Sequence, residues 1–158
     1  MPKISPSKRE ERRRQILKAA VSCFARRGFH QTTVEEICKA AGLSPGAVYR
    51  YFPSKGEIIR AVAEESKKRN LELLRSALSE GPVGEVALSL LRRYFQMFQE
   101  GSPEVAIVDM ELLAEASRDQ PLAASVAEML GQLLQVAASL VEEAQRRGRL
   151  RADVEPLA

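Results

Sequence analysis

The sequence contains few of the residues that build disulfide-bonded or β-rich proteins. Of its 158 residues two are cysteines, none is tryptophan, and aromatic residues make up 5%. Two cysteines exclude a multiply disulfide-bonded scaffold and favour the reducing cytoplasm. Scarce aromatic residues and β-branched runs argue against a β-sandwich or barrel. Hydrophobic residues at 45% and charged residues at 28% still permit one packed soluble core, which excludes global disorder.

Long uninterrupted apolar runs are also missing. The longest apolar runs in the sequence fall well short of the length that a membrane-spanning helix needs, so we expect no membrane partner. Residues 1–14 are polar and basic and contain no apolar segment, so we expect no secretory signal and a cytoplasmic protein.

Positive charge is concentrated early in the chain, although the net charge is only +3. Residues 1–60 hold 13 Lys and Arg against 5 Asp and Glu, whereas the remainder holds 11 against 16. A basic first third on an acidic remainder favours contact with a polyanion such as nucleic acid. A soluble protein with unevenly distributed surface charge would give the same counts.

Apolar periodicity and capping signals predict an all-α protein. Thr33 with Glu36, and Ser54 with Glu57, have the spacing of a capping box, and Gly42 suits a helix end. Gly-Pro and Gln-Pro pairs separate the later helices, and the charged middle of the fourth helix is expected in solvent. The expected helices span about 9–27, 34–41, 44–52, 54–78, 83–99, 104–117 and 122–147, with domains at 1–53 and 54–158.

Two short helices joined by Ala41-Gly42-Leu43-Ser44 form a helix-turn-helix pattern after a longer amphipathic helix. The second short helix must anchor one face in the core, which Val48 and Phe52 can do. Its other face must offer hydrogen-bond donors to DNA, and the pattern places Tyr49, Arg50 and Tyr51 outward or sideways.

Residues 28–55 carry a longer signature that resembles the DNA-binding domain of TetR-family transcriptional regulators. Cys38 stands where the family usually has alanine, and Pro45 where a polar residue is common. The helices after Lys55 resemble the family's effector-binding and dimerisation domain only in the number of helices and in the positions of the breaks between them. The signature comprises Gly28-Phe29, Thr32-Thr33-Val34, Ala41-Gly42-Leu43-Ser44, Tyr49-Arg50-Tyr51-Phe52 and Ser54-Lys55.

The resemblance implies roles for individual residues. Thr33, Tyr49 and Lys55 are expected to contact phosphates, which fixes register without reading sequence. Arg50 and Tyr51 are the expected polar base readers, and Ala47 can touch a thymine methyl. Three further residues at the exposed start of the recognition helix complete the expected DNA-binding set, namely Ser44, Pro45 and Gly46. The basic residues Lys3, Lys8, Arg9 and Arg12 either reach DNA as an arm or are simply solvated.

The family resemblance also implies a ligand pocket among the later helices. Each expected pocket residue has plain core packing as its alternative. Asp109 and Glu111 either face a cavity, where they would favour a cationic ligand, or lie on the solvated surface. The expected pocket residues are Tyr94, Phe95, Phe98, Met110, Met129 and Leu133.

Catalytic and metal chemistry has little support in the sequence. His30 is the only histidine, and its spacing to Cys23 and Cys38 matches no zinc pattern, so both cysteines are expected to be inert core residues. We therefore expect no enzyme, no metal and no cofactor. A helical adaptor for a protein partner is the main alternative, but it would have no use for the Thr33, Tyr49 and Lys55 set.

These features together predict a regulator that binds double-stranded DNA. We expect a homodimer on a pseudo-palindromic operator, released when a small-molecule effector tilts the fourth helix and changes the spacing of the recognition helices. The family favours repression, and activation stays open.

The last residues suggest an incomplete dimer interface. Asp153 can cap a further helix of which 153–158 hold only the first turn, and relatives in this family usually continue with two more helices. The apolar and small residues that would face those helices are expected to form an exposed patch and to leave dimers weak; they are Leu134, Val136, Ala138 and Ser139.

Overall fold

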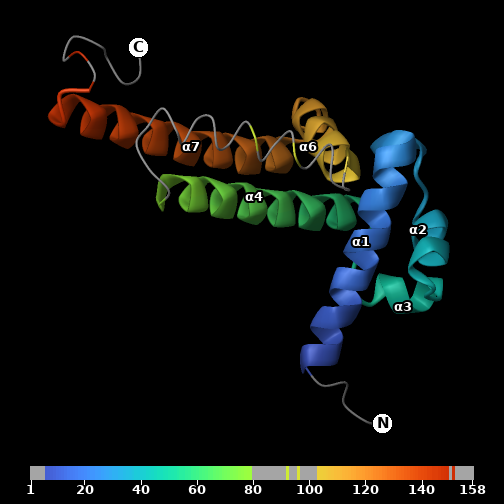
Figure 1. Ribbon diagram of the computed structural model, residues 1–158. Coiled ribbons are helices and arrows are strands. Elements are labelled where there is room, and N and C mark those ends of the chain that lie inside the picture. The colour runs from blue at the N-terminus through green and yellow to red at the C-terminus, as the bar shows by residue number, and fades with distance from the viewer. Residues whose placement is uncertain (1–5, 80–91, 93–95, 97–102, 150, 152–158) are drawn as a thin grey trace.

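The computed structural model describes residues 6–79, 92, 96, 103–149 and 151, and no strand occurs among them, which confirms the all-α prediction (Figure 1). The expected helix at 83–99 lies outside these residues, apart from Arg92 and Gln96. The described helices are α1 (Pro6–Gln31), α2 (Val34–Ala41), α3 (Pro45–Tyr49), α4 (Lys55–Ser79), α6 (Pro103–Ala116) and α7 (Gln120–Arg146).

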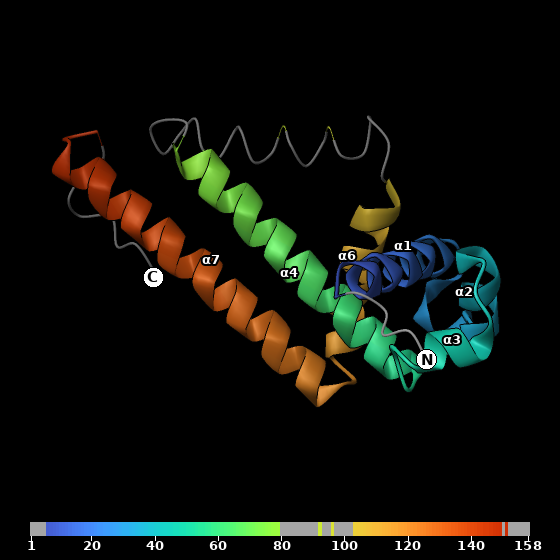
Figure 2. The same ribbon diagram turned by 90° about the horizontal axis from the view of Figure 1, so that it is seen from below.

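Helices α1, α2 and α3 form one end of the molecule, and α4 leads away from them beside α7 (Figures 1 and 2). Glu64 accepts a hydrogen bond from Ser125, and Lys67 pairs with Glu128, so the two helices run in the same direction. Helix α6 contacts both α1 and α7. Most of the charged middle of α4 is therefore paired with neighbouring helices, through Glu64 and Lys67 to α7, Glu65 to α1 and Arg69 to α6, whereas Lys68 is exposed as expected.

Local sequence signals explain the ends of α1 and α2. The helix expected to end at Arg27 continues to Gln31, but its backbone leaves helical geometry at Gly28, where φ is 72° and ψ is 168°. Gly42 follows α2 with φ 65° and ψ 34°, a left-handed conformation that suits glycine. The Leu43 amide donates to the Cys38 carbonyl at 3.0 Å, and the Leu43 side chain packs on the core as predicted.

The starts of α3 and α7 are both formed by a polar cap followed by proline. The Ser44 hydroxyl accepts from the Ala47 amide at 3.3 Å, with Pro45 in the first turn as expected. The break expected at Gln120-Pro121 lies slightly earlier, at residues 117–119, and α7 starts at Gln120, because Asp119 accepts from the Leu122 amide at 2.9 Å and Pro121 occupies the first turn.

One continuous hydrophobic core connects the N-terminal helices with α4, α6 and α7. Phe24 and Phe29 form an edge-to-face pair within it, with ring centroids 4.8 Å apart. The cluster crosses the domain boundary expected at residue 53, and that division stays a prediction. Its fully buried side chains include Ile16, Phe24, Phe29, Ile37, Val48, Ile58, Val108 and Leu122.

Helix α7 differs from the expectation about apolar runs. Within the described residues it is the one helix long and apolar enough to cross a membrane by length and composition, with a mean hydropathy of 1.4 over an 18-residue window. Counting uninterrupted runs missed this helix. A single helix of this kind is weak evidence for a membrane span, because a core helix of a soluble protein has the same composition. The absence of a membrane partner stays a prediction.

Candidate nucleic-acid interface

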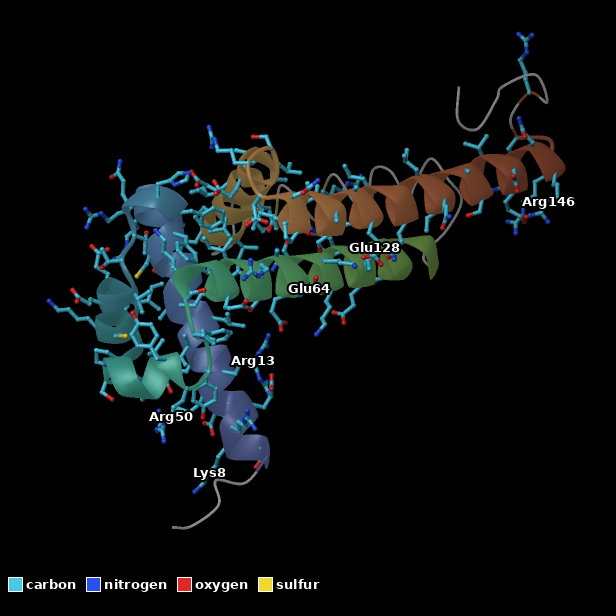
Figure 3. The ribbon with its side chains drawn as sticks, turned by 180° about the vertical axis from the view of Figure 1, so that it is seen from behind. Lys8, Arg13, Arg50, Glu64, Glu128 and Arg146 are labelled. Carbon is cyan, nitrogen blue, oxygen red and sulfur yellow. The ribbon has the colours of Figure 1, made fainter. Side chains whose placement is uncertain are left out.

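Helix α3 has one buried and one exposed face. Val48 and Phe52 are 0% and 5% exposed, which confirms that they anchor the helix in the core. The Arg13 guanidinium lies 5.8 Å from the centroid of the Phe52 ring and covers it. Tyr49 is 49% exposed and Arg50 is exposed. Arg50 extends from α3 away from the other helices (Figure 3), so its guanidinium is available to a partner.

The first residues of α3 are open to an approaching partner, whereas Tyr51 is less so. Ser44, Pro45 and Gly46 are exposed, and no atom lies within 4 Å of a Cβ placed on Gly46. Ala47 is half-buried. Tyr51 was expected outward or sideways, but its half-buried ring packs against the hydrophobic core. A base contact by Tyr51 stays a prediction.

Thr33 forms both hydrogen bonds of the predicted capping box. Its hydroxyl accepts from the Glu36 amide at 3.2 Å, and its own amide donates to Glu36 Oε2 at 2.8 Å. The backbone hydrogen bond from Thr33 is the main reason that the pKa of the Glu36 carboxyl lies below its usual value. Glu36 also pairs with Arg27. A carboxylate thus already occupies this helix end, which was expected to be open to phosphate.

Lys55 was expected to offer its ammonium to phosphate, but its Nζ lies among backbone carbonyls. It donates to the carbonyl oxygens of Phe29 at 2.8 Å, His30 at 3.2 Å and Thr32 at 3.0 Å. These are the last carbonyls of α1 and of the link to α2. An ammonium has three N–H donors, so all of them have protein acceptors. The phosphate contact stays a prediction, but the geometry is that of a clamp between the start of α4 and the end of α1.

Two polar side chains to which the sequence assigned no role also hold these helices together. Gln15 Nε2 on α1 donates to the Ala41 carbonyl at the end of α2, at 2.6 Å. The Thr32 hydroxyl, 1% exposed, donates to the Gly28 carbonyl at 2.8 Å. Both satisfy carbonyls at helix ends that would otherwise lack a partner. For Gln15 a half-buried polar position beside the apolar face of α1 was the available signal, whereas Thr32 lies in the link between α1 and α2.

Carboxylates of α6 contact the far half of α1. Glu111 Oε2 accepts from the Phe29 amide at 3.2 Å and lies beside Gly28, where an added Cβ would approach Glu111 Oε1 at 3.3 Å. Glu115 lies 3.0 Å from His30 Nε2. The alternatives for Glu111 were a cavity or a solvated surface, and the structure shows neither. It satisfies the backbone at the α1 kink.

The expected ligand-pocket residues are only partly described. Tyr94, Phe95, Phe98 and the side chain of Leu133 lie outside the described residues. Met129 on α7 is half-buried, with its Sδ 3.9 Å from Asn70 Nδ2. Met110 is 55% exposed, so it lacks the burial expected of a pocket wall, because it lies on the outward side of α6. The pocket stays a prediction.

Apolar residues on α6 and α7 remain exposed in the described chain. Leu134 is 54% exposed and Ser139 is exposed, whereas Val136 and Ala138 are half-buried. The expected patch is thus centred on Leu134. Other large apolar side chains with at least 41% exposure are Ile107, Met110, Leu113 and Leu130.

The cysteines and the histidine are not brought together. Cys23 and Cys38 are both buried and free, and burial raises the pKa of the Cys38 thiol, which disfavours the reactive thiolate. His30 pairs with Glu115 instead of either cysteine. Among the residues that the structure describes, no group of three or more His, Cys, Asp or Glu side chains is arranged to hold a metal ion.

Known proteins match both the N-terminal helices and the whole fold. The family described as "Bacterial regulatory proteins, tetR family" matches residues 16–62. The HTH-type transcriptional regulator UidR of Escherichia coli K12 is 28% identical over 142 residues, which cover 90% of this chain and 70% of UidR.

Solved structures extend this likeness to the later helices. Salmonella enterica GusR has a TM-score of 0.75 at 28% identity, covering 98% of this chain and 78% of GusR. The fatty acid degradation regulator FadR of Bacillus halodurans has a TM-score of 0.76 at 28% identity, covering 98% of this chain and 76% of FadR. With its exposed recognition helix α3 anchored through Val48 and Phe52, this chain belongs to the TetR family of DNA-binding, ligand-responsive transcriptional regulators.

Proposed function

We propose that α3 reads the major groove of a pseudo-palindromic operator and that two copies of the chain bind its two half-sites as a repressor. The observation that carries this proposal is the exposure of Arg50 and Tyr49 on a helix fixed by Val48 and Phe52. Arginine can donate two hydrogen bonds to guanine in the major groove, whereas a tyrosine hydroxyl beside it suits a phosphate.

In this proposal residues 1–53 form the DNA-binding domain, and residues 54–158 form the effector-binding and dimerisation domain. The protein acts in the bacterial cytoplasm without catalysis. The N-terminal end of α1, which carries Lys8, extends beyond α3 (Figure 3) and suits a contact with flanking phosphates. In this proposal Thr33 and Lys55 contribute by holding the helices in place. The exposed apolar face around Leu134 supports self-association.

The effector is proposed to act through α4. FadR of Bacillus subtilis, which is 24% identical, was solved with stearoyl-CoA, and this likeness supports the fold alone. In our proposal a ligand of the effector domain shifts α4, and the Lys55 clamp carries the shift to the end of α1. An activator with the same DNA contacts is the second candidate, and transcription assays with the operator upstream of a promoter distinguish the two.

Selection of binding sites from random DNA tests the base-reading role. Arg50→Ala should lower affinity for the selected operator by about 1–3 kcal/mol and relax the preference at one position in each half-site. Arg146→Ala is the matched control, because Arg146 pairs with Glu143 at the distant end of α7 (Figure 3) and should leave the motif unchanged. An identical motif for the wild type and Arg50→Ala would reduce Arg50 to a phosphate contact.

A further inference from the structure

A small cavity lies where α1, α4 and α6 meet, and no expected pocket residue lines it. Its volume is about 110 Å³. Apolar side chains contribute from all three helices, including Val21 of α1, Val62 of α4 and Val108 of α6. Figure 2 shows these helices converging beside the N-terminal domain. The cavity is therefore a mainly apolar space between the DNA-binding helices and the rest of the chain.

One side of the cavity is polar and tightly organised. The Ser66 hydroxyl donates to Asp109 Oδ1 at 2.6 Å, and Arg69 Nη2 lies 2.9 Å from both oxygens of Asp109. The Asp109 side chain is 15% exposed, so this carboxylate, which was expected to line a cavity or to be solvated, does line one. Arg69 Nε is buried, and no acceptor lies within hydrogen-bond distance of it in the described part of the chain.

Arg69 lines the cavity, and its Nε is a buried donor without a hydrogen-bond partner in the described part of the chain. A buried N–H group without an acceptor is unfavourable, and native proteins leave few of them. The charged groups around the cavity cancel, since Lys18 and Arg69 are offset by Glu65 and Asp109. Glu65 is in turn paired with Arg13 at 3.0 Å. An anionic ligand would meet Asp109 directly, so the missing acceptor is best supplied by an uncharged molecule.

We propose that this cavity binds a small uncharged carbonyl compound whose oxygen accepts a hydrogen bond from Arg69 Nε. An apolar cavity of about 150 Å³ holds one benzene, so a space of this size holds on the order of five heavy atoms. The apolar part of the ligand contacts Val21, Val62 and Val108. Because these valines come from three helices, the ligand stabilises one arrangement of α1 relative to α4 and α6.

Three probes of five heavy atoms each separate the contributions of the carbonyl oxygen, of negative charge and of apolar contact to binding: butanone, propanoate and pentane. Methyl NMR of the valines at increasing probe concentration measures binding to the full chain without any DNA. We expect saturable shifts of the Val21, Val62 and Val108 methyl signals with butanone, at a dissociation constant on the order of a millimolar. Pentane and propanoate should bind at least ten-fold more weakly. Equal binding of pentane, or tighter binding of propanoate, would overturn the proposal.

Variants test the site itself. Arg69→Lys keeps the charge but removes Nε and should weaken butanone at least ten-fold, whereas the same change at the exposed Arg118 should have no effect. Val21→Leu and Val105→Leu each add a methylene at half-buried positions that line the cavity, and both should reduce binding. Unchanged butanone affinity in the leucine variants, or no valine shifts in the wild type, would show that the cavity is not the site. These readouts are independent of the proposed DNA-binding function.

Discussion

Replacing Lys55 by methionine separates a clamp from a phosphate contact. The change keeps the apolar stem and removes an ammonium that donates to three backbone carbonyls, at 2.8, 3.2 and 3.0 Å. A hydrogen bond to a charged group contributes about 1.5–3 kcal/mol. The three bonds share one half-exposed ammonium, and water can replace part of them, so we expect a total loss of about 2 kcal/mol.

The loss should be visible in thermal unfolding. For a chain of this size, about 1 kcal/mol corresponds to a change of about 2–4 °C in Tm, so Lys55→Met should melt about 4–8 °C lower. Lys68→Met is the matched control, because Lys68 is exposed on the same helix and its side chain has no hydrogen bond or ion pair among the described residues. The control should melt like the wild type.

DNA binding by the same variants gives the second measurement. Anisotropy titrations of a non-specific duplex at several salt concentrations report how many phosphates are neutralised. If Lys55 acts as a clamp, Lys55→Met lowers affinity while the salt slope stays close to that of the wild type. A wild-type Tm combined with a salt slope reduced by about one per protomer would refute the clamp and restore the phosphate contact.

Two further predictions follow from the capping box and from the exposed apolar face. The folded state lowers the pKa of Glu36, so the charge of this carboxylate stabilises the protein at pH values above its ordinary pKa of 4.5, and this contribution is lost as the pH falls through the lowered pKa. The Tm difference between the wild type and Glu36→Gln should therefore shrink in acid. A Tm difference that stays constant with pH would contradict the role of the charge. Leu134→Glu should weaken self-association in sedimentation equilibrium, since it places a charge on an apolar contact, and unchanged association would move the interface elsewhere.

Features encoded by neighbouring residues were predictable from the sequence. The caps at Thr33 and Ser44 and the left-handed Gly42 depend on groups within four or five residues of one another, and the anchoring face of α3 follows from the spacing of Val48 and Phe52. The same local rules placed the start of α7 two residues late, because proline both ends one helix and suits the first turn of another. Only the hydrogen bond from Leu122 to Asp119 distinguishes the two cases.

Roles decided by distant parts of the chain were not predictable. The carbonyls that accept from Lys55 lie 23–26 residues away, and Asp109 meets Arg69 across 40 positions. Periodicity identifies the face of a helix that is buried but does not identify its neighbour. Glu111 illustrates this limit, since its role depends on α6 approaching the α1 kink, which no pattern in either helix indicates.

The unbroken core has a consequence for how this regulator can be divided. Ile58 and Val62 of α4 and Leu112 of α6 belong to the same cluster as Ile16 of α1. A fragment ending at residue 53 would expose to water the apolar surface that these residues now cover. The DNA-binding helices thus share their core with α4 and α6, so we expect local melting of α6 to weaken operator binding even without an effector.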